Sequence, residues 1–210
     1  MKKHVLFTEG IPTLIVIILL SAFLYYLHPL LTILGLGLLI FVLYFFRDPN
    51  REIPKQEEYI LSPADGLITD ITEVEEGLFI KDKVTLISIF MSPLDVHVNR
   101  SPIEGKVSFL EYKKGKFIPA TKPESHIVNE KNYIGIENEK TKILVVQVAG
   151  IMARRIVHWL KIGQNVGKGD KIGMIKFSSG TQVYLPKNIE VTVKKGDKLK
   201  AGATIIGRYS

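Results

Sequence analysis

The sequence predicts a mainly β (α+β) catalytic domain preceded by an N-terminal transmembrane helical hairpin. Residues 11–46 contain no Asp, Glu, Lys or Arg, which marks a long apolar segment at the front of the chain. From residue 59 onward, short runs rich in Val, Ile, Thr, Tyr and Phe alternate with Gly, Pro and charged residues, which is typical of strands and turns. We therefore expect a hairpin over 1–46, a polar linker over 47–58 and a catalytic domain over 59–210.

The apolar segment divides into two helices. As one helix, residues 11–46 would extend about 54 Å, which is too long for a ~30 Å hydrocarbon core. His28-Pro29 separates residues 11–27 from 30–46, and each half would extend about 26 Å as a helix. Such a hairpin would just cross the bilayer or insert deeply into one leaflet. A buried helix pair and a cleaved signal peptide are the alternatives, and the second apolar segment argues against the signal peptide.

Charges flanking the apolar segment predict its orientation. Lys2 and Lys3 precede it, and Arg47 and Arg51 follow it, so both ends should face the cytoplasm and the catalytic domain should lie there, at the cell membrane. Residues 47–210 carry 26 Lys and Arg against 20 Asp and Glu, and a basic domain beside a bilayer is attracted to anionic lipid headgroups. The sequence has no Arg-rich helix or aromatic RNA-binding signature, so we expect a membrane partner and no nucleic acid.

The catalytic domain should consist mostly of strands. The predicted strands are 66–71, 83–91, 105–110, 133–136 and 142–149. A short helix is expected over 152–160, between Gly150 and Gly163. A weak repeat begins at Val166 and again at Val193, and each copy contains a Gly-Asp pair that favours a hairpin turn. This rhythm is similar to that of barrel-sandwich hybrid domains, so we expect a barrel-sandwich-hybrid-like β domain.

Composition restricts the chemistry. The chain has no cysteine, which excludes disulfides, thiolate metal sites and a cysteine nucleophile. It has five histidines but no H-x-H or H-x-x-x-H spacing, so no metal site is predicted.

Three stretches carry candidate chemistry. The first, Ser62-Pro-Ala-Asp-Gly66, offers the carboxylate of Asp65 in a tight turn. In the second, Asp95, His97 and Asn99 occupy every second position of the sequence. An extended backbone would place those three on one face, where Asp65 or Asp95 could orient the imidazole as a general acid or base. Taken alone, an aspartate in a proline turn and a histidine in a strand are more often structural than catalytic. In the third stretch, Ser178-Ser179-Gly180 interrupts a β-branched run, which indicates either a bulge or a place where the chain does chemistry on itself.

Five ordered blocks, taken together, resemble the phosphatidylserine decarboxylase family, in particular its short branch. The resemblance covers nearly all of residues 59–186, and the family also includes archaetidylserine decarboxylases. The blocks are 62–66, 90–100, 129–132, 147–157 and 173–179, the last followed by Val183-Tyr-Leu-Pro186. The resemblance implies an enzyme that decarboxylates a phospholipid serine headgroup, of phosphatidylserine or archaetidylserine, to the ethanolamine lipid.

The resemblance also implies a pyruvoyl cofactor derived from Ser179. The Ser179 Oγ would attack the carbonyl of Ser178, which stands where the short branch usually has Gly, and convert the amide to an ester. Elimination and hydrolysis would then release ammonia and leave chains 1–178 and 179–210, which remain together as a heterodimer. The pyruvoyl group would condense with the substrate amine as a Schiff base and accept the electrons left when CO₂ departs.

Further roles follow from the family's motif. Asp65 is expected to act in self-cleavage or in orientation, and His97 in proton transfer during decarboxylation. Arg100 stands where the longer branch has a second histidine, and we expect it to bind the lipid phosphate together with Asn99. Arg154 and Arg155 could take that role instead, or simply cover a solvated helix face.

Two other functions are compatible with the sequence. One is a membrane serine peptidase with Ser179 as nucleophile and a lysine or His97 as base. The other is a membrane-tethered barrel-sandwich adaptor or carrier, although the Met-Lys-Met sequence of biotinyl carriers is absent. Only the decarboxylase predicts two chains with a blocked second amino terminus. The sequence leaves open the ester or ether nature of the lipid and whether the chain forms a homo-oligomer.

Overall fold

The computed structural model describes residues 9–118, 124, 128–150, 155–176 and 179–209. The chain divides into two compact units, residues 1–50 and residues 51–210, which are taken in turn.

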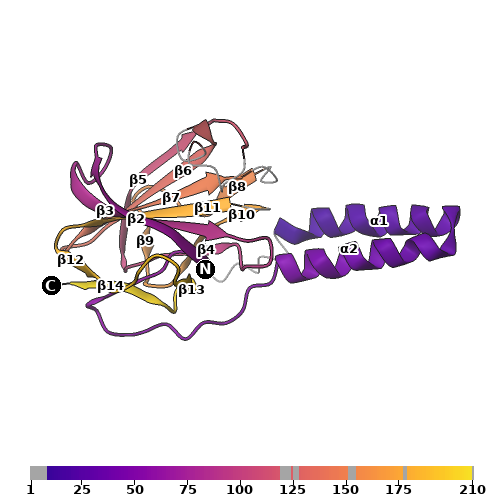
Figure 1. The fold of residues 1–210 in the computed structure, drawn as a ribbon, viewed down its shortest axis with the longest axis horizontal. Coiled ribbons are helices and arrows are strands. Elements are labelled where there is room, and N and C mark those ends of the chain that lie inside the picture. Colours follow the sequence, from indigo (N-terminus) through magenta and orange to yellow (C-terminus); the bar gives the residue numbers. More distant parts are fainter. Residues whose placement is uncertain (1–8, 119–123, 125–127, 151–154, 177–178, 210) are drawn as a thin grey trace. The chain divides into compact units, whose positions relative to one another are not determined.

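The first unit is a helical hairpin. It comprises α1 (Ile11–Leu27), the 3₁₀ turn η2 (Pro29–Leu31) and α2 (Thr32–Phe45), coloured indigo and violet in Figure 1. His28 ends α1 with an extended backbone, and its Nδ1 accepts a hydrogen bond from the Leu30 N–H at 3.2 Å. Gly35 of α2 lies so close to Ser21 of α1 that a side chain there would collide with the serine. The two helices therefore pack against each other through small residues.

The predicted break at His28-Pro29 is present, with a helix on each side. The prediction that this hairpin is transmembrane was wrong, because no helix in the described part of the chain is both long and apolar enough to cross a membrane. The helix α1 has 17 residues and α2 has 14. At 1.5 Å per residue they extend about 26 and about 21 Å, short of a ~30 Å hydrocarbon core.

The second unit consists of strands in three sheets (Figure 1). The described strands are β1 (Tyr59–Leu61), β2 (Gly66–Glu76), β3 (Asp82–Met91), β4 (Val98–Arg100), β5 (Gly105–Lys113), β6 (Lys131–Glu137), β7 (Lys142–Ala149), β8 (Arg155–His158), β9 (Asn165–Val166), β10 (Lys171–Lys176), β11 (Ser179–Pro186), β12 (Ile189–Val191), β13 (Lys198–Leu199) and β14 (Ile205–Tyr209). The large sheet has the order β13-β2-β3-β11-β7-β6-β5-β9. Two smaller sheets have the orders β4-β10-β8 and β1-β14-β12.

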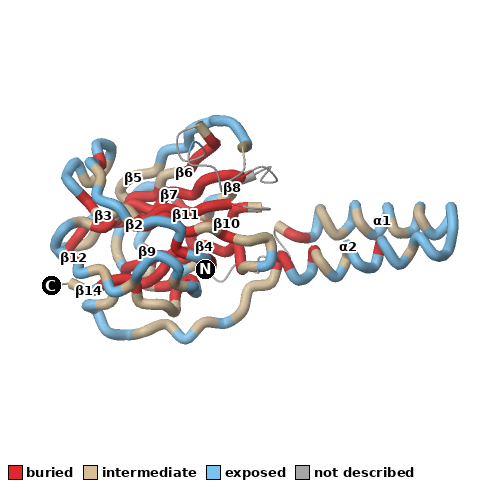
Figure 2. The backbone as a smooth tube through the Cα atoms, in the orientation of Figure 1, coloured by how far each residue is buried: buried red, intermediate tan, exposed pale blue. Residues whose placement is uncertain are grey.

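Strand β11 occupies the middle of the large sheet. It pairs antiparallel with β3 on one side and with β7 on the other. Ser179, its first residue, lies opposite Met91 and Ala149, which are the last residues of those two neighbours. Figure 2 shows most of β7 and β11 as buried.

Side chains alternate between two faces of the large sheet, as expected for strands. Val145 and Val183 point into the main hydrophobic core, which the two smaller sheets also line. Val146 and Tyr184 point to the opposite face, where Phe79 and Phe109 stack with ring centroids 5.8 Å apart. Ser179 shares its register with Val183, so it faces the main core.

The predicted mainly β class is confirmed. Val128 has a helical conformation, and its N–H donates to the carbonyl of Glu124 at 3.0 Å. The helix predicted over 152–160 was wrong, because residues 155–158 form β8, whose backbone pairs with β10. The apolar periodicity was compatible with either structure, and pairing with β10 decided in favour of a strand. Met152 to Arg154 lie outside the described residues.

The repeated Gly-Asp pairs form the same turn twice. The Asp170 carboxylate accepts the N–H of Gly167 at 2.7 Å, and the Asp197 carboxylate accepts that of Lys194 at 2.9 Å. The turns were predicted correctly, but they do not make hairpins. Strand β9 pairs with β5, whereas β10 pairs with β4 and β8. The chain therefore changes sheets at the first turn, as a sandwich architecture requires.

Candidate functional site

Ser179 lies buried at the end of the large sheet where β11 begins. Its Oγ donates a hydrogen bond to the Met91 Sδ at 3.5 Å. A thioether is a weak acceptor, and because the hydroxyl is the donor in this contact, its oxygen lone pairs stay available. Phe177 and Ser178, on the other side of the predicted cleavage point, lie outside the described residues.

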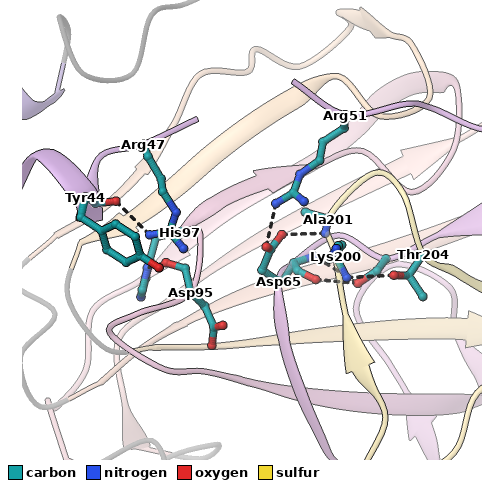
Figure 3. Close-up of polar contacts among 11 residues, drawn as sticks. Tyr44, Arg47, Arg51, Asp65, Asp95, His97, Lys200, Ala201 and Thr204 are labelled. Carbon is teal, nitrogen blue, oxygen red and sulfur yellow. Dashed lines mark hydrogen bonds and ion pairs between the residues drawn. The ribbon is translucent and has the colours of Figure 1, made fainter. Parts of the chain in front are cut away.

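Asp65 is fixed in its turn by two donors. Its Oδ2 accepts from Arg51 Nη2 at 2.7 Å, and its Oδ1 accepts from the Ala201 N–H at 2.8 Å (Figure 3). Burial raises the pKa of Asp65 above its ordinary value of 3.8, and the bonds from Ala201 and Arg51 offset only part of that effect. The turn itself is closed by Ser62, whose Oγ donates to the Ala64 carbonyl at 2.7 Å. The carboxylate therefore has one defined orientation and an increased affinity for a proton.

His97 is buried next to a short turn that ends at Asp95. The Asp95 carboxylate accepts the Ser92 N–H at 2.8 Å. The Asp95 carbonyl lies 2.9 Å from His97 Nδ1, and both residues are labelled in Figure 3. Because a carbonyl oxygen can only accept, Nδ1 carries a proton, and Nε2 is the nitrogen that can exchange one. The His97 carbonyl accepts from the Ile175 N–H at 3.4 Å, which places the histidine beside the strand that leads towards Ser179.

The Asp65 turn is hydrogen-bonded to the strand that follows His97. The Pro63 carbonyl accepts the Arg100 N–H at 2.9 Å and the Asn99 Nδ2 at 3.2 Å. The Asn99 Nδ2 also donates to Thr181 Oγ1 at 3.1 Å, two residues after Ser179. The structure thus connects the Asp65 turn, β4 and the start of β11, which are far apart in the sequence.

The prediction that Asp95, His97 and Asn99 share one face of a single strand was wrong. Strand β4 begins only at Val98, and Asp95 lies in the preceding turn. The proline at position 93 restricts the backbone there and favours the turn. Asp95 therefore holds the histidine through its backbone carbonyl, whereas its carboxylate closes the turn.

Arg100 and Asn99 both make internal contacts. Arg100 is 8% exposed, and its Nη1 donates to the Gly169 carbonyl at 3.0 Å. Asn99 is fully buried. Their expected role in binding the lipid phosphate stays a prediction. Arg154 lies outside the described residues, and Arg155 begins β8. Among the residues that the structure describes, no three His, Asp or Glu side chains gather as metal ligands.

The residues that sequence reasoning missed are polar side chains on the inner face of apolar strands. Gln147 is fully buried among valines of β7, and Thr181 is fully buried in β11. Arg51, the partner of Asp65, was predicted as a linker residue and as a charge that orients the hairpin, not as part of the site. A polar residue at an inward position of a Val-rich run could have identified Gln147, because buried polar groups need partners.

Comparisons with known proteins agree on one family. Residues 38–207 match the family model described as phosphatidylserine decarboxylase. The chain is 50% identical over 190 residues to the phosphatidylserine decarboxylase proenzyme of Carboxydothermus hydrogenoformans, with 85% of this chain and 89% of that protein covered. It is 42% identical over 209 residues to the proenzyme of the same name from Symbiobacterium thermophilum, with 99% and 97% covered.

Proposed function

Because the chain belongs to the phosphatidylserine decarboxylase family and is a decarboxylase, we propose that it converts the serine headgroup of phosphatidylserine to ethanolamine with a pyruvoyl group made from Ser179. The observation that carries this proposal is the place of Ser179. It is a buried hydroxyl at the first position of the central strand, and the Asp65 turn and β4, the strand that follows His97, are hydrogen-bonded to each other and to the start of β11.

The first step is self-cleavage, for which the proenzyme names of the relatives give support. The Ser179 Oγ attacks the carbonyl carbon of Ser178, and the peptide C–N bond breaks as an ester forms. Removal of the Ser179 Cα proton then expels the carboxylate of Ser178. The resulting dehydroalanine adds water and loses ammonia, which leaves a pyruvoyl group at the start of the second chain. The thioether contact suits this step, because the hydroxyl donates its proton to Met91 and keeps its oxygen lone pairs available for the attack.

The site fits a small pyruvoyl group. The Cα of residue 179 is fixed between Met91 and Ala149 by the strand ladder, and the conversion removes atoms from a position that is already packed. When present, this group supplies an electron sink for loss of CO₂. His97 then gives a proton from Nε2, since its Nδ1 is fixed by the Asp95 carbonyl. Asp65 acts in self-cleavage, where its raised pKa suits a proton acceptor.

The two chains remain together after cleavage. Residues 179–210 supply β11 to the large sheet between β3 and β7, and β14 to a smaller sheet between β1 and β12. Separation would therefore expose the core and leave backbone groups of several strands unpaired. The product of self-cleavage is a non-covalent heterodimer.

The enzyme acts at the cytoplasmic face of the cell membrane in this proposal. Large apolar side chains are exposed along both helices of the hairpin, among them Val16 at 64%, Leu19 at 65% and Ile33 at 68%. Exposed apolar surface of this kind favours lipid contact. The positive net charge favours anionic headgroups, to which the proposed substrate belongs.

The alternative of a serine peptidase finds no support in the comparisons with known proteins. Its proposed nucleophile, Ser179, lies in a chain whose family model and relatives are phosphatidylserine decarboxylases, and none of these names is that of a peptidase. The carrier alternative would need an exposed modifiable group at a turn, whereas the candidate residues Ser179 and His97 are internal.

The experiment measures release of ¹⁴CO₂ from phosphatidylserine or archaetidylserine in detergent micelles, with the ¹⁴C in the carboxyl group of the serine. We expect wild-type enzyme to release CO₂ and the Ser179→Ala variant to release none, because alanine offers no Oγ to attack or leave. Turnover by Ser179→Ala at the wild-type rate would contradict the proposal. Activity on the ether lipid alone would replace phosphatidylserine as the substrate.

A further inference from the structure

Four buried side chains form a hydrogen-bonded row across the core. Each belongs to a different strand, and each is at most 1% exposed. Asn132 Nδ2 donates to Gln147 Oε1 at 2.8 Å, and Gln147 Nε2 donates to Asn99 Oδ1 at 2.8 Å. Asn99 Nδ2 then donates to Thr181 Oγ1 at 3.1 Å. We call these residues (Asn132, Gln147, Asn99 and Thr181) the amide row.

The amide row has a fixed direction. Gln147 receives at its oxygen and gives at its nitrogen, and Asn99 does the same. The Asn99 amide uses one proton for the Pro63 carbonyl and the other for Thr181. Turning over the Gln147 amide would therefore break two hydrogen bonds, and turning over the Asn99 amide would break three. The Thr181 hydroxyl is thereby made an acceptor from Asn99, and its own proton points elsewhere.

That proton reaches the methionine that also holds the nucleophile. Thr181 Oγ1 donates to Met91 Sδ at 3.3 Å, and Ser179 Oγ donates to the same sulfur at 3.5 Å. The two hydroxyls lie two residues apart on one face of β11. Because the Thr181 hydroxyl already donates to the Met91 sulfur, the Ser179 hydroxyl can donate to that sulfur from one remaining direction only. The amide row therefore restricts, through Thr181 and Met91, the rotamers that the Ser179 side chain can adopt.

The surrounding backbone leaves room for this arrangement. Gly173 of β10 lies opposite Asn99 in the strand ladder, and a side chain at 173 would crowd the Gln147 amide, with its Cβ at 3.0 Å from Nε2. The row thus links the β4-β10-β8 sheet to strands β6, β7 and β11 of the large sheet. Apolar residues of similar size could fill these positions, so stability alone does not require a polar row.

We propose that the amide row is a positioning device for self-cleavage, an inference that rests on the proposed function. It holds the Ser179 hydroxyl, through Thr181 and Met91, in the orientation from which Oγ attacks the preceding carbonyl. The Ser179 Oγ is lost when the pyruvoyl group forms, so its bond to Met91 exists only in the uncleaved chain. The row should therefore govern the rate of cleavage and have little effect on turnover by chains already cleaved.

The test follows cleavage of the full chain in a cell-free translation reaction with phosphatidylserine-containing vesicles. Thr181→Val keeps the size of the side chain and removes its hydroxyl, whereas Thr181→Ser keeps the hydroxyl. Gln147→Met breaks the row two steps from Thr181 without touching Met91. Misplacement of a reacting group by about 1 Å can cost about 100-fold. We expect Thr181→Val and Gln147→Met to be cleaved ~10–100-fold more slowly, and Thr181→Ser within about threefold of wild type.

A matched control separates positioning from a general loss of stability. Glu76→Gln weakens a loop at the opposite end of β3 and should lower the melting temperature without slowing cleavage. CO₂ release per pyruvoyl group, titrated with a hydrazine reagent, should stay within about threefold of wild type in the cleaved fraction of each variant. Wild-type cleavage rates in both Thr181→Val and Gln147→Met would overturn the positioning role. Slowing of Glu76→Gln equal to theirs would also overturn it. A wild-type chain that never cleaves would instead refute the proposed function.

Discussion

Asp65→Asn should separate folding from self-cleavage. The aspartate accepts two hydrogen bonds, from Arg51 and from the Ala201 N–H. An asparagine has the same shape, but one of its two terminal atoms is an NH₂ group that cannot accept. Whichever way the amide is turned, one donor loses its partner. The charge that opposes Arg51 is lost as well.

The stability cost of Asp65→Asn follows from that count. A hydrogen bond to a charged group contributes about 1.5–3 kcal/mol, and the asparagine avoids the cost of burying a carboxylate, so we expect a loss of about 2 kcal/mol. Both side chains of the pair are only 12% exposed, so solvent screening is small. For a domain of this size, 2 kcal/mol lowers the melting temperature by about 4–8 °C. The variant should therefore fold.

The pH dependence of stability gives a second signature. Burial raises the pKa of Asp65, so the folded chain holds this proton more tightly than the unfolded chain does. Between the ordinary value of 3.8 and the raised pKa, the wild-type free energy of unfolding should therefore fall as pH rises. Asp65→Asn should lack this contribution. Denaturant titrations of both proteins across acidic pH measure the difference.

Self-cleavage of Asp65→Asn should be at least ~100-fold slower at neutral pH, the usual size of a lost acid–base contribution. The assay is the appearance of the second chain with time on denaturing gels, beside a thermal melt of the same sample. A folded Asp65→Asn variant that cleaves at the wild-type rate would refute the role of Asp65. Glu76→Gln, with a similar loss of stability, is the control.

Three further changes have defined outcomes. His97→Ala should still give two chains but release CO₂ at least ~100-fold more slowly, because the proton donor is lost; full activity of the cleaved fraction would exclude His97 from that role. Deletion of residues 1–46 should leave a domain that self-cleaves and turns over a short-chain lipid far better than bilayer lipid, and equal loss on both would contradict a lipid-contacting hairpin. Glu76→Gln should cost about 2 kcal/mol by thermal denaturation. Burial alone would raise the pKa of Glu76, but hydrogen bonds from four backbone N–H groups, Leu78 to Lys81, lower it below 4.5. The contribution of Glu76 to the free energy of unfolding is therefore present above pH 4.5 and is lost as pH falls through the lowered pKa. A Glu76→Gln variant as stable as wild type at pH 7 would contradict this account.

Much of the fold could be predicted because its signals are local. The uncharged stretch with His28-Pro29 at its centre predicted two helices, and alternating β-branched runs predicted the long strands. The strand at 155–158 could not be predicted in the same way, because its partner β10 follows it in the chain and decides its structure. Tertiary pairing overrode a local helical pattern there.

The candidate site was predictable at the level of motifs but not of contacts. Ser179, Asp65 and His97 stood out by residue type and neighbouring sequence. Gln147 and Thr181 did not, because a polar side chain inside a strand has no local signature of its partner. The distance in sequence from Asn99 to Thr181 is too large for any periodicity to connect them. Only the folded sheets bring these side chains within hydrogen-bonding distance.

The mass of the purified wild-type protein under denaturing conditions tests the central claim most directly. Self-cleavage between Ser178 and Ser179 predicts two chains, of 178 and 32 residues, with the second resistant to amino-terminal sequencing because it begins with a pyruvoyl group. A single chain of 23.6 kDa that nevertheless decarboxylates phosphatidylserine, or a second chain with a free amino terminus, would contradict the account.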